Sequence, residues 1–182
     1  KVFLKHHNVL MVTTKSDLIV RDLDILSEIA QTGFLNVVLT IPMINEDLRR
    51  KIEPKAPSIY KRVEILNKIH SAGITVGITA IPLLPYISDG EKDLEKLIKT
   101  FAENGADYVI LDMLNFREEA RGRVMEFIKN YYPDLVPEYE KLYKTDYCDK
   151  EYAKQIRKHA NKLIKKYKVD NYDKMFSYRK GE

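Results

Sequence analysis

Four short apolar segments recur along the chain, about 30 to 40 residues apart, and helical patterns of apolar residues lie between them. This alternation predicts parallel strands joined by right-handed helical crossovers. The segments are apolar throughout, which is typical of strands covered on both faces. We therefore predict an α/β fold with a parallel sheet of about four strands, over Asn8–Thr14, Leu35–Ile41, Thr75–Ile81 and Asp107–Met113.

The connections between these segments carry helix start and stop signals. Asn45 is a predicted N-cap, and the short helix that it begins ends before Pro54, because the residue before a proline avoids helical geometry. Ser58 is predicted to cap the next helix. Ser88 and Glu91 have capping-box spacing at the start of a third. The loop before that third helix is predicted to begin at Pro82.

The pattern changes after Asn115, where charged helical stretches replace the alternation. Helices are predicted over Arg117–Asn130, Glu138–Tyr143 and Asp149–Tyr167. Glycine is nearly absent from this part, so no flexible linker and no second domain are expected. We divide the chain into residues 1–116, which form the sheet and its helices, and residues 117–182, a C-terminal helical extension packed on them.

Composition excludes several classes of protein. One cysteine and four histidines exclude a cysteine-built zinc or iron–sulfur site within this chain. No apolar run approaches the ~18 residues that a membrane-spanning helix needs. No secretion signal is recognisable at the start, and a cytoplasmic location is expected.

Charge is distributed unevenly. Residues 141–182 hold 13 Lys or Arg and six Asp or Glu, a net charge of +7, whereas residues 1–140 carry −3. Two interpretations of this basic tail stay open: contact with nucleic acid, or a solvated helical face. The tyrosines of the tail likewise fit either stacking on bases or packing of the extension onto the sheet.

The carboxyl ends of the predicted strands are where binding groups are expected in a parallel sheet. Lys15 follows the first strand, where it can meet a carboxylate or phosphate or be only a surface lysine at the end of the strand. Thr40 lies near the end of the second strand, where it can offer its hydroxyl to a polar ligand or be only a threonine at a β-favourable position. Pro82 and Leu114 follow the third and fourth strands. Glu53 precedes a proline in a loop, where it can be an acid, a base or a hydrogen-bond anchor, or only a loop or cap residue; the sequence does not decide between these roles.

Several runs resemble one family. TTKSDLIVRDLDIL, LRRKIEPKAPSIYKRVEIL and AGITVGITAIPLLPYISD are similar to the radical S-adenosylmethionine proteins of the spore photoproduct lyase-like (DNA repair photolyase-like) group. The run FIKNYYPDLVPEYEKLY resembles the C-terminal extension of that group. The resemblance covers nearly the whole chain, and EPKAPS between two helices is its most specific part.

The resemblance implies a partial (β/α) barrel of the TIM-barrel type. It implies a 4Fe-4S cluster held by a CxxxCxxC loop, and reductive cleavage of S-adenosylmethionine to a radical that abstracts hydrogen from a substrate. Carried over by position, Lys15 reaches the methionine carboxylate of the cofactor and Thr40 lies near its methionine or ribose. Many relatives have serine where this chain has Val38. Pro82 and Leu114 correspond to the adenine side.

One departure limits what the resemblance implies. CxxxCxxC is absent from these 182 residues, and the first strand corresponds to the third strand of the family. We therefore expect a C-terminal portion that alone binds no cluster or cofactor and is inert. Its first strand would be an exposed edge that invites self-association. The alternatives are a nucleic-acid-binding module and a structural (β/α) protein without cluster chemistry.

Overall fold

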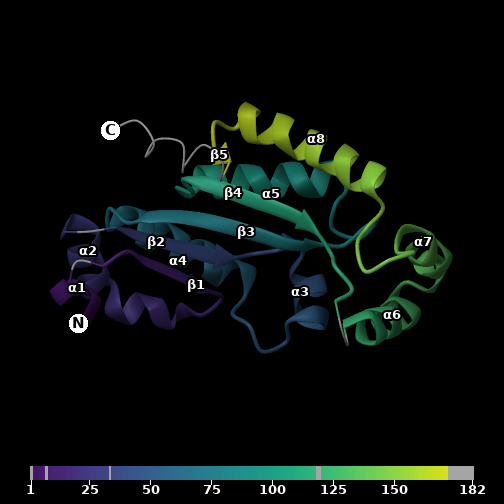
Figure 1. The fold of residues 1–182 in the computed structure, drawn as a ribbon, viewed down its shortest axis with the longest axis horizontal. Coiled ribbons are helices and arrows are strands. Elements are labelled where there is room, and N and C mark those ends of the chain that lie inside the picture. Colours follow the sequence, from purple (N-terminus) through teal and green to yellow (C-terminus); the bar gives the residue numbers. More distant parts are fainter. Residues whose placement is uncertain (1, 7, 33, 118–119, 172–182) are drawn as a thin grey trace.

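The computed structural model describes residues 2–6, 8–32, 34–117 and 120–171. Its centre is a sheet whose strands all run parallel, in the spatial order β1-β2-β3-β4-β5, which is also their order in the sequence (Figure 1). The strands are β1 Leu10–Thr14, β2 Leu35–Thr40, β3 Thr75–Leu83, β4 Tyr108–Met113 and β5 Asp170–Asn171.

The predicted fold class is confirmed: the chain is an α/β protein that forms part of a β/α barrel, followed by a helical C-terminal part. Each of the four predicted strands is present. The fifth strand was missed because two residues are too few to give an apolar pattern; it pairs with Tyr108 and Val109 of β4.

Helices occupy most of the connections. The α-helices are α1 Val2–His6, α2 Leu23–Thr32, α3 Glu46–Ile52, α4 Ile59–Ser71, α5 Glu91–Glu103, α6 Ala120–Tyr131, α7 Val136–Leu142 and α8 Lys150–Lys166, and two 3₁₀ helices are η1 Asp17–Asp22 and η2 Pro133–Leu135. Figure 1 shows α6 and α7 beyond the carboxyl ends of β3 and β4. The sequence pattern had not indicated α1.

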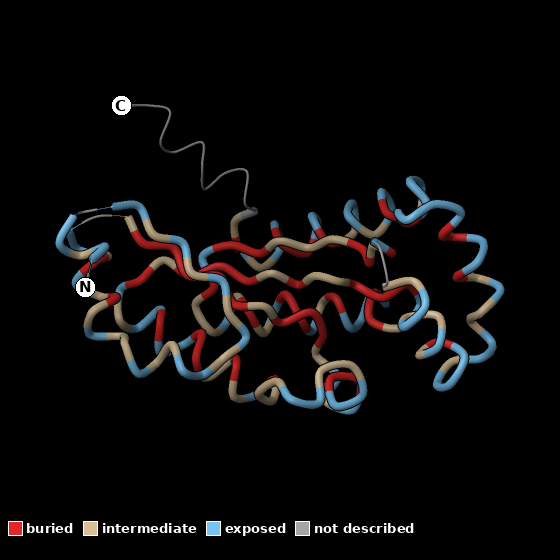
Figure 2. Tube along the Cα trace, turned by 60° about the horizontal axis from the view of Figure 1, so that its bottom comes forward, coloured by how far each residue is buried: buried red, intermediate tan, exposed pale blue. Residues whose placement is uncertain are grey.

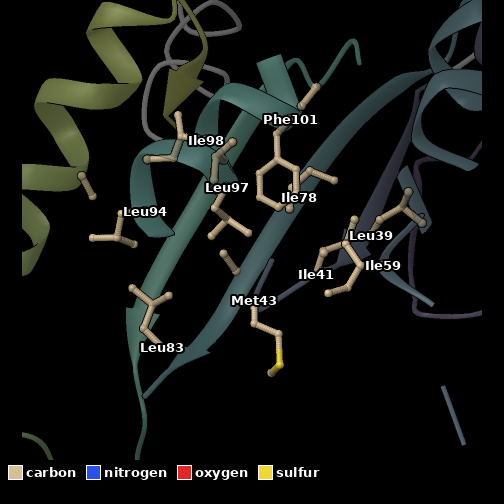
Figure 3. Packing of buried hydrophobic residues seen from close by; sticks show 14 of the residues in the cluster. Leu39, Ile41, Met43, Ile59, Ile78, Leu83, Leu94, Leu97, Ile98 and Phe101 are labelled. Atoms are coloured by element: carbon tan, nitrogen blue, oxygen red, sulfur yellow. The ribbon is translucent and has the colours of Figure 1, made fainter. Parts of the chain in front are cut away.

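The core lies between the sheet and its helices. Burial is greatest along the central strands, and the exposed positions lie mainly on the outer helices (Figure 2). In α5, Leu94, Leu97, Ile98 and Phe101 recur at helical spacing and are buried in the core (Figure 3). Each such side chain contributes about 1.5–3 kcal/mol when it is fully buried.

Two of the three predicted helix starts are confirmed. The Asn45 side chain accepts from the backbone N–H groups of Asp47 and Leu48, and Ser58 accepts from Lys61. The predicted capping box is wrong: the N-cap of α5 is Gly90, which has no side-chain cap.

Ser88 and Asp89 serve the preceding turn instead of the helix. The Ser88 hydroxyl accepts from the N–H of Leu84 at 2.9 Å, and the Asp89 carboxylate accepts from that of Tyr86 at 2.8 Å. Both residues are buried. Their side chains thus provide acceptors for two backbone donors of the turn, and the bond to Leu84 is buried.

The third strand is longer than predicted. Pro82 lies within β3, which ends at Leu83, and the register against β4 shifts between Ala80 and Leu83. An irregular ladder tolerates a residue that lacks a backbone donor, so the proline does not end the strand.

Tyrosines attach the C-terminal part to the sheet and its loops. The hydroxyls of Tyr139 and Tyr143 donate to the carbonyls of Pro85 and Leu114, at 3.1 and 3.0 Å. Burial raises the pKa of both phenols. For these two tyrosines the packing interpretation holds. Of the predicted extension 117–182, residues 118–119 and 172–182 lie outside the described residues, and the division at residue 116 stays a prediction.

Among the residues that the structure describes, no helix combines the length and the apolarity that crossing a membrane requires.

Candidate functional site at the carboxyl edge of the sheet

The four predicted site residues lie at corresponding places in the fold. Lys15 follows β1, Thr40 ends β2, Pro82 is near the end of β3, and Leu114 follows β4. Because these strands are parallel neighbours, all four residues lie along one edge of the sheet, its carboxyl edge.

A local turn orients Lys15. The hydroxyl of Thr14 accepts from the N–H of Ser16 at 2.9 Å, and the hydroxyl of Ser16 accepts from the N–H of Leu18 at 3.2 Å. Ser16 is also the N-cap of η1. The polar residues on both sides of Lys15 thus fix its backbone at the point where the chain leaves the sheet.

Lys15 forms an ion pair with Glu53, a residue whose role the sequence left open. The Lys15 ammonium donates to Oε1 of Glu53. The Lys15 side chain is 44% exposed, whereas that of Glu53 is 9% exposed. Burial alone would raise the pKa of Glu53, but hydrogen bonds from Lys15 and Arg62 outweigh it and hold the pKa below its ordinary value.

Arg62 of α4 lies beneath this pair and is only 1% exposed. Its guanidinium donates to Oε2 of Glu53 at 2.8 Å, to the carbonyl of Thr40 at 2.8 Å and to that of Pro57 at 3.0 Å. A buried guanidinium is tolerated only when its donors find acceptors, and here both terminal nitrogens and Nε do so.

A second buried arginine shapes the segment that carries Glu53. Arg49 of α3 donates to the carbonyls of Glu53 and Ala56, both at 2.9 Å, and to the carboxylate of Glu46. Glu46 in turn accepts from the N–H of Ile59 at the start of α4. The segment Glu53–Ser58, which we name the brace, is therefore held between two arginines.

Sequence reasoning missed both arginines, although a signal for one was present. Arg62 stands four and seven residues before Leu66 and Ile69, which are buried on α4. A charged residue in line with the buried apolar residues of a helix faces the core, so it must be buried and needs a partner. For Glu53 no such signal exists, because its partners Lys15 and Arg62 are 38 and nine residues away and only the fold brings them together.

Leu114 and Pro82 occupy the other end of the edge. Leu114 is buried, its N–H donates to the carbonyl of Leu83 at 2.9 Å, and its own carbonyl accepts from Tyr143. Pro82 is partly buried. This end is mainly apolar, in contrast to the charged end at Lys15.

The described residues contain no group of three His, Cys, Asp or Glu side chains that could hold a metal ion. Cys148 is buried, and burial raises the pKa of its thiol, which disfavours the thiolate that a metal would need. The residues present do not fit a 4Fe-4S cluster. They do fit a carboxylate, because Lys15 and Arg62 with Glu53 leave one net positive charge at the edge.

A cavity of about 650 Å³ lies apart from these residues, between the loop after β3 and the start of α8. Its lining includes Tyr86, Tyr147 and Tyr152 together with Lys141, Lys144 and Lys150. None of the four predicted site residues lines it.

Comparison with known sequences gives relatives without an assigned activity. No protein-family model matches the chain. An uncharacterized protein of Acidianus two-tailed virus is 32% identical over 160 residues, which are 86% of this chain and 48% of that protein. An uncharacterized protein of Mycobacterium tuberculosis is 29% identical over 161 residues, 88% of this chain and 47% of that protein. The chain thus spans about half the length of these relatives.

Comparison with solved structures identifies the fold. A tyrosine-to-phenylalanine variant of spore photoproduct lyase matches with a TM-score of 0.62 at 18% identity, over 90% of this chain and 49% of the lyase. Another variant, with bound AdoMet and dinucleoside spore photoproduct, matches with a TM-score of 0.61 at 18% identity, over 87% and 48%. The chain therefore has the fold of about half of spore photoproduct lyase, and the resemblance that its sequence indicated is confirmed as a shared fold.

Proposed function

We propose that this chain is the C-terminal portion of a radical S-adenosylmethionine enzyme, and that its carboxyl edge binds the cofactor. The observation that carries the proposal is the half-exposed Lys15 ammonium, fixed by a buried carboxylate at the carboxyl edge of a fold shared with a lyase solved with bound AdoMet.

Each end of the edge suits a different part of S-adenosylmethionine. Lys15 would pair with the methionine carboxylate, since an ammonium–carboxylate hydrogen bond is among the stronger ones in proteins. Thr40 would lie near the methionine or ribose. Leu114 and Pro82 offer apolar contact for the adenine side. Val38 has no hydroxyl, so it supplies no polar contact.

A 4Fe-4S cluster held by a CxxxCxxC loop would supply the electron that cleaves S-adenosylmethionine to the hydrogen-abstracting radical. The ligands of that cluster are not among these residues, so the chain alone would be inert and would bind neither the cluster nor the cofactor stably. A cytoplasmic location belongs to the same proposal.

The upstream coding sequence and one assay test this proposal. We expect a CxxxCxxC motif within about 100–150 residues upstream, by analogy with the length of a β/α barrel. The gene product, reconstituted anaerobically with iron and sulfide and then reduced, should convert S-adenosylmethionine to 5′-deoxyadenosine. A start codon near Lys1, or no 5′-deoxyadenosine from a product that holds a cluster, contradicts the proposal.

Self-association through β1 is a separate part of the proposal. Among the described strands β1 pairs only with β2, and Val9 and Met11 are exposed large apolar residues at this edge. Unpaired parallel edges with apolar side chains favour pairing with another strand. Light scattering coupled to size-exclusion chromatography of the 182-residue chain should show a dimer or larger species, and a monomer at all concentrations contradicts it.

Nucleic acid is the second candidate partner, and the outer face of α8 favours it. A shallow groove there is lined by Lys154, Arg157, Lys158, Asn161, Lys162 and Lys165. Within the described part of the chain, Lys158, Lys162 and Lys165 form no ion pair, and all three are exposed. Three unneutralised cations on one helix face suit a phosphate backbone.

The salt dependence of oligonucleotide binding tests this second candidate. The logarithm of the binding constant falls linearly with the logarithm of the salt concentration. Replacement of Lys158, Lys162 and Lys165 by Gln should make this fall less steep, by about 2 in slope for a single strand. A matched control replaces the exposed Lys55, Lys92 and Lys96 by Gln and should leave the slope nearly unchanged. Absence of binding at low salt, or equal effects of the two triple variants, contradicts it.

A further inference from the structure

We propose that Glu53 and Arg62 are positioning residues that hold the Lys15 ammonium where it receives the carboxylate of S-adenosylmethionine. The inference rests on the proposed function and adds to it two residues that do not touch the ligand. It is carried by a continuous chain of contacts, from Arg62 to Glu53 and from Glu53 to Lys15.

Glu53 cannot readily move. Its side chain is almost excluded from solvent, one oxygen accepts from Arg62 at 2.8 Å, and the other accepts from Lys15. Its backbone carbonyl is held by Arg49 at 2.9 Å. A carboxylate fixed at both its side chain and its main chain provides a rigid reference point for a flexible partner.

Lys15 is the mobile partner. A lysine side chain has a flexible stem of four methylene carbons and an ammonium with three donor hydrogens. One hydrogen bond to Glu53 leaves two of these donors for a ligand. The side chain is half-exposed, so without Glu53 its ammonium would sample several rotamers in water. Ordering such a side chain in advance removes part of the entropic cost of binding.

Arg62 also connects the two charged and polar residues of the edge. The same guanidinium that holds Glu53 donates to the carbonyl of Thr40 at 2.8 Å. Lys15 and Thr40, which lie at the carboxyl ends of different strands, are therefore placed relative to one another by one buried side chain. This shared anchor explains why a charge is retained in the core at this point.

The test measures ligand binding by the gene product reconstituted with its cluster and kept without reductant, so that S-adenosylmethionine stays intact. Glu53→Gln keeps the shape of the side chain and removes its charge. Two ligands are compared: S-adenosylmethionine, and 5′-methylthioadenosine, which lacks the methionine carboxylate. The control is Glu64→Gln, which removes a partly exposed carboxylate of α4 that pairs with Lys61 and Lys68.

We expect Glu53→Gln to weaken S-adenosylmethionine binding about two- to ten-fold, the range for one side chain that is no longer pre-ordered. Binding of 5′-methylthioadenosine should be unchanged. In a Lys15→Met background, Glu53→Gln should have no further effect, because Glu53 acts only through the ammonium. Glu64→Gln should leave both affinities unchanged.

The other outcomes distinguish failure of the positioning role from failure of the proposed function. Equal weakening for both ligands, an undiminished effect in the Lys15→Met background, or tighter S-adenosylmethionine binding by Glu53→Gln would overturn the positioning role and leave the proposed function standing. If the unsubstituted protein holds a cluster and still binds no S-adenosylmethionine, the proposed function is overturned, and the positioning role falls with it.

Discussion

Oε2 of Glu53 lies 2.8 Å from Nη2 of Arg62, and both side chains are nearly removed from solvent. The two residues are nine positions apart and belong to the brace and to α4. Their ion pair joins a loop to a helix beneath the carboxyl edge, and the exposed Lys15 completes it on the solvent side.

Removal of the buried Arg62 guanidinium should destabilise the fold. We expect Arg62→Leu to lower the free energy of unfolding by about 3–5 kcal/mol, because it leaves the Glu53 carboxylate buried with one partner fewer. Urea denaturation followed by circular dichroism measures the change. Arg50→Leu is the matched control, since Arg50 is exposed on α3, and it should change the free energy by less than about 0.5 kcal/mol. Equal effects of the two substitutions would refute the role given to Arg62.

The Glu53 carboxylate predicts a pH dependence of stability. Its pKa is lower in the folded chain than the ordinary value of 4.5, so its stabilising effect is complete above pH 4.5 and is lost as the pH falls through the lower folded pKa. The free energy of unfolding of the unsubstituted chain should therefore exceed that of Glu53→Gln at neutral pH. The difference should narrow in acid, and a difference that is constant from pH 7 to pH 3 argues against a charged Glu53.

Gly77 of β3 is required by the ring of Tyr108. A Cβ on Gly77 would lie 2.0 Å from Cζ of that ring. The Tyr108 hydroxyl accepts from the Asn36 amide at 2.7 Å, so the ring cannot shift without disturbing a buried hydrogen bond. We expect Gly77→Ala to destabilise the chain by about 1–3 kcal/mol in thermal unfolding. Gly122→Ala, where a Cβ meets no atom within 4 Å, is the control.

The Tyr143 hydroxyl attaches the C-terminal part to the end of β4. Tyr143→Phe should cost about 1–3 kcal/mol, because it leaves the buried carbonyl of Leu114 without this donor. Tyr60→Phe removes a hydroxyl that is exposed on α4 and should be nearly neutral. Chemical denaturation measures the free energy of unfolding of both variants. A neutral Tyr143→Phe would show that the carbonyl of Leu114 finds another donor.

The sequence was sufficient for the architecture because strands such as 35–40 and helices such as α5 follow local rules. Apolar runs and helical periodicity are properties of neighbouring residues, and the caps at Asn45 and Ser58 are equally local. The fifth strand and the extension of β3 past Pro82 depend on tertiary pairing, which local patterns do not contain.

The common edge of the candidate residues could be predicted for the same reason. Strand ends could be read from the sequence, and they placed Lys15, Thr40, Pro82 and Leu114 on one edge. The partner of Lys15 could not be read, because Glu53 is 38 residues away and pairs through a brace whose shape depends on two buried arginines. Ion pairs between residues far apart in the sequence become visible only when the fold is known.

The most direct test of the central claim compares S-adenosylmethionine binding by the cluster-loaded gene product with and without Lys15→Met. The loss of one charge-assisted hydrogen bond should weaken binding at least about ten-fold. Binding of 5′-methylthioadenosine should be unaffected. Equal affinities of the two proteins for S-adenosylmethionine would show that Lys15 does not receive the carboxylate and would contradict the account.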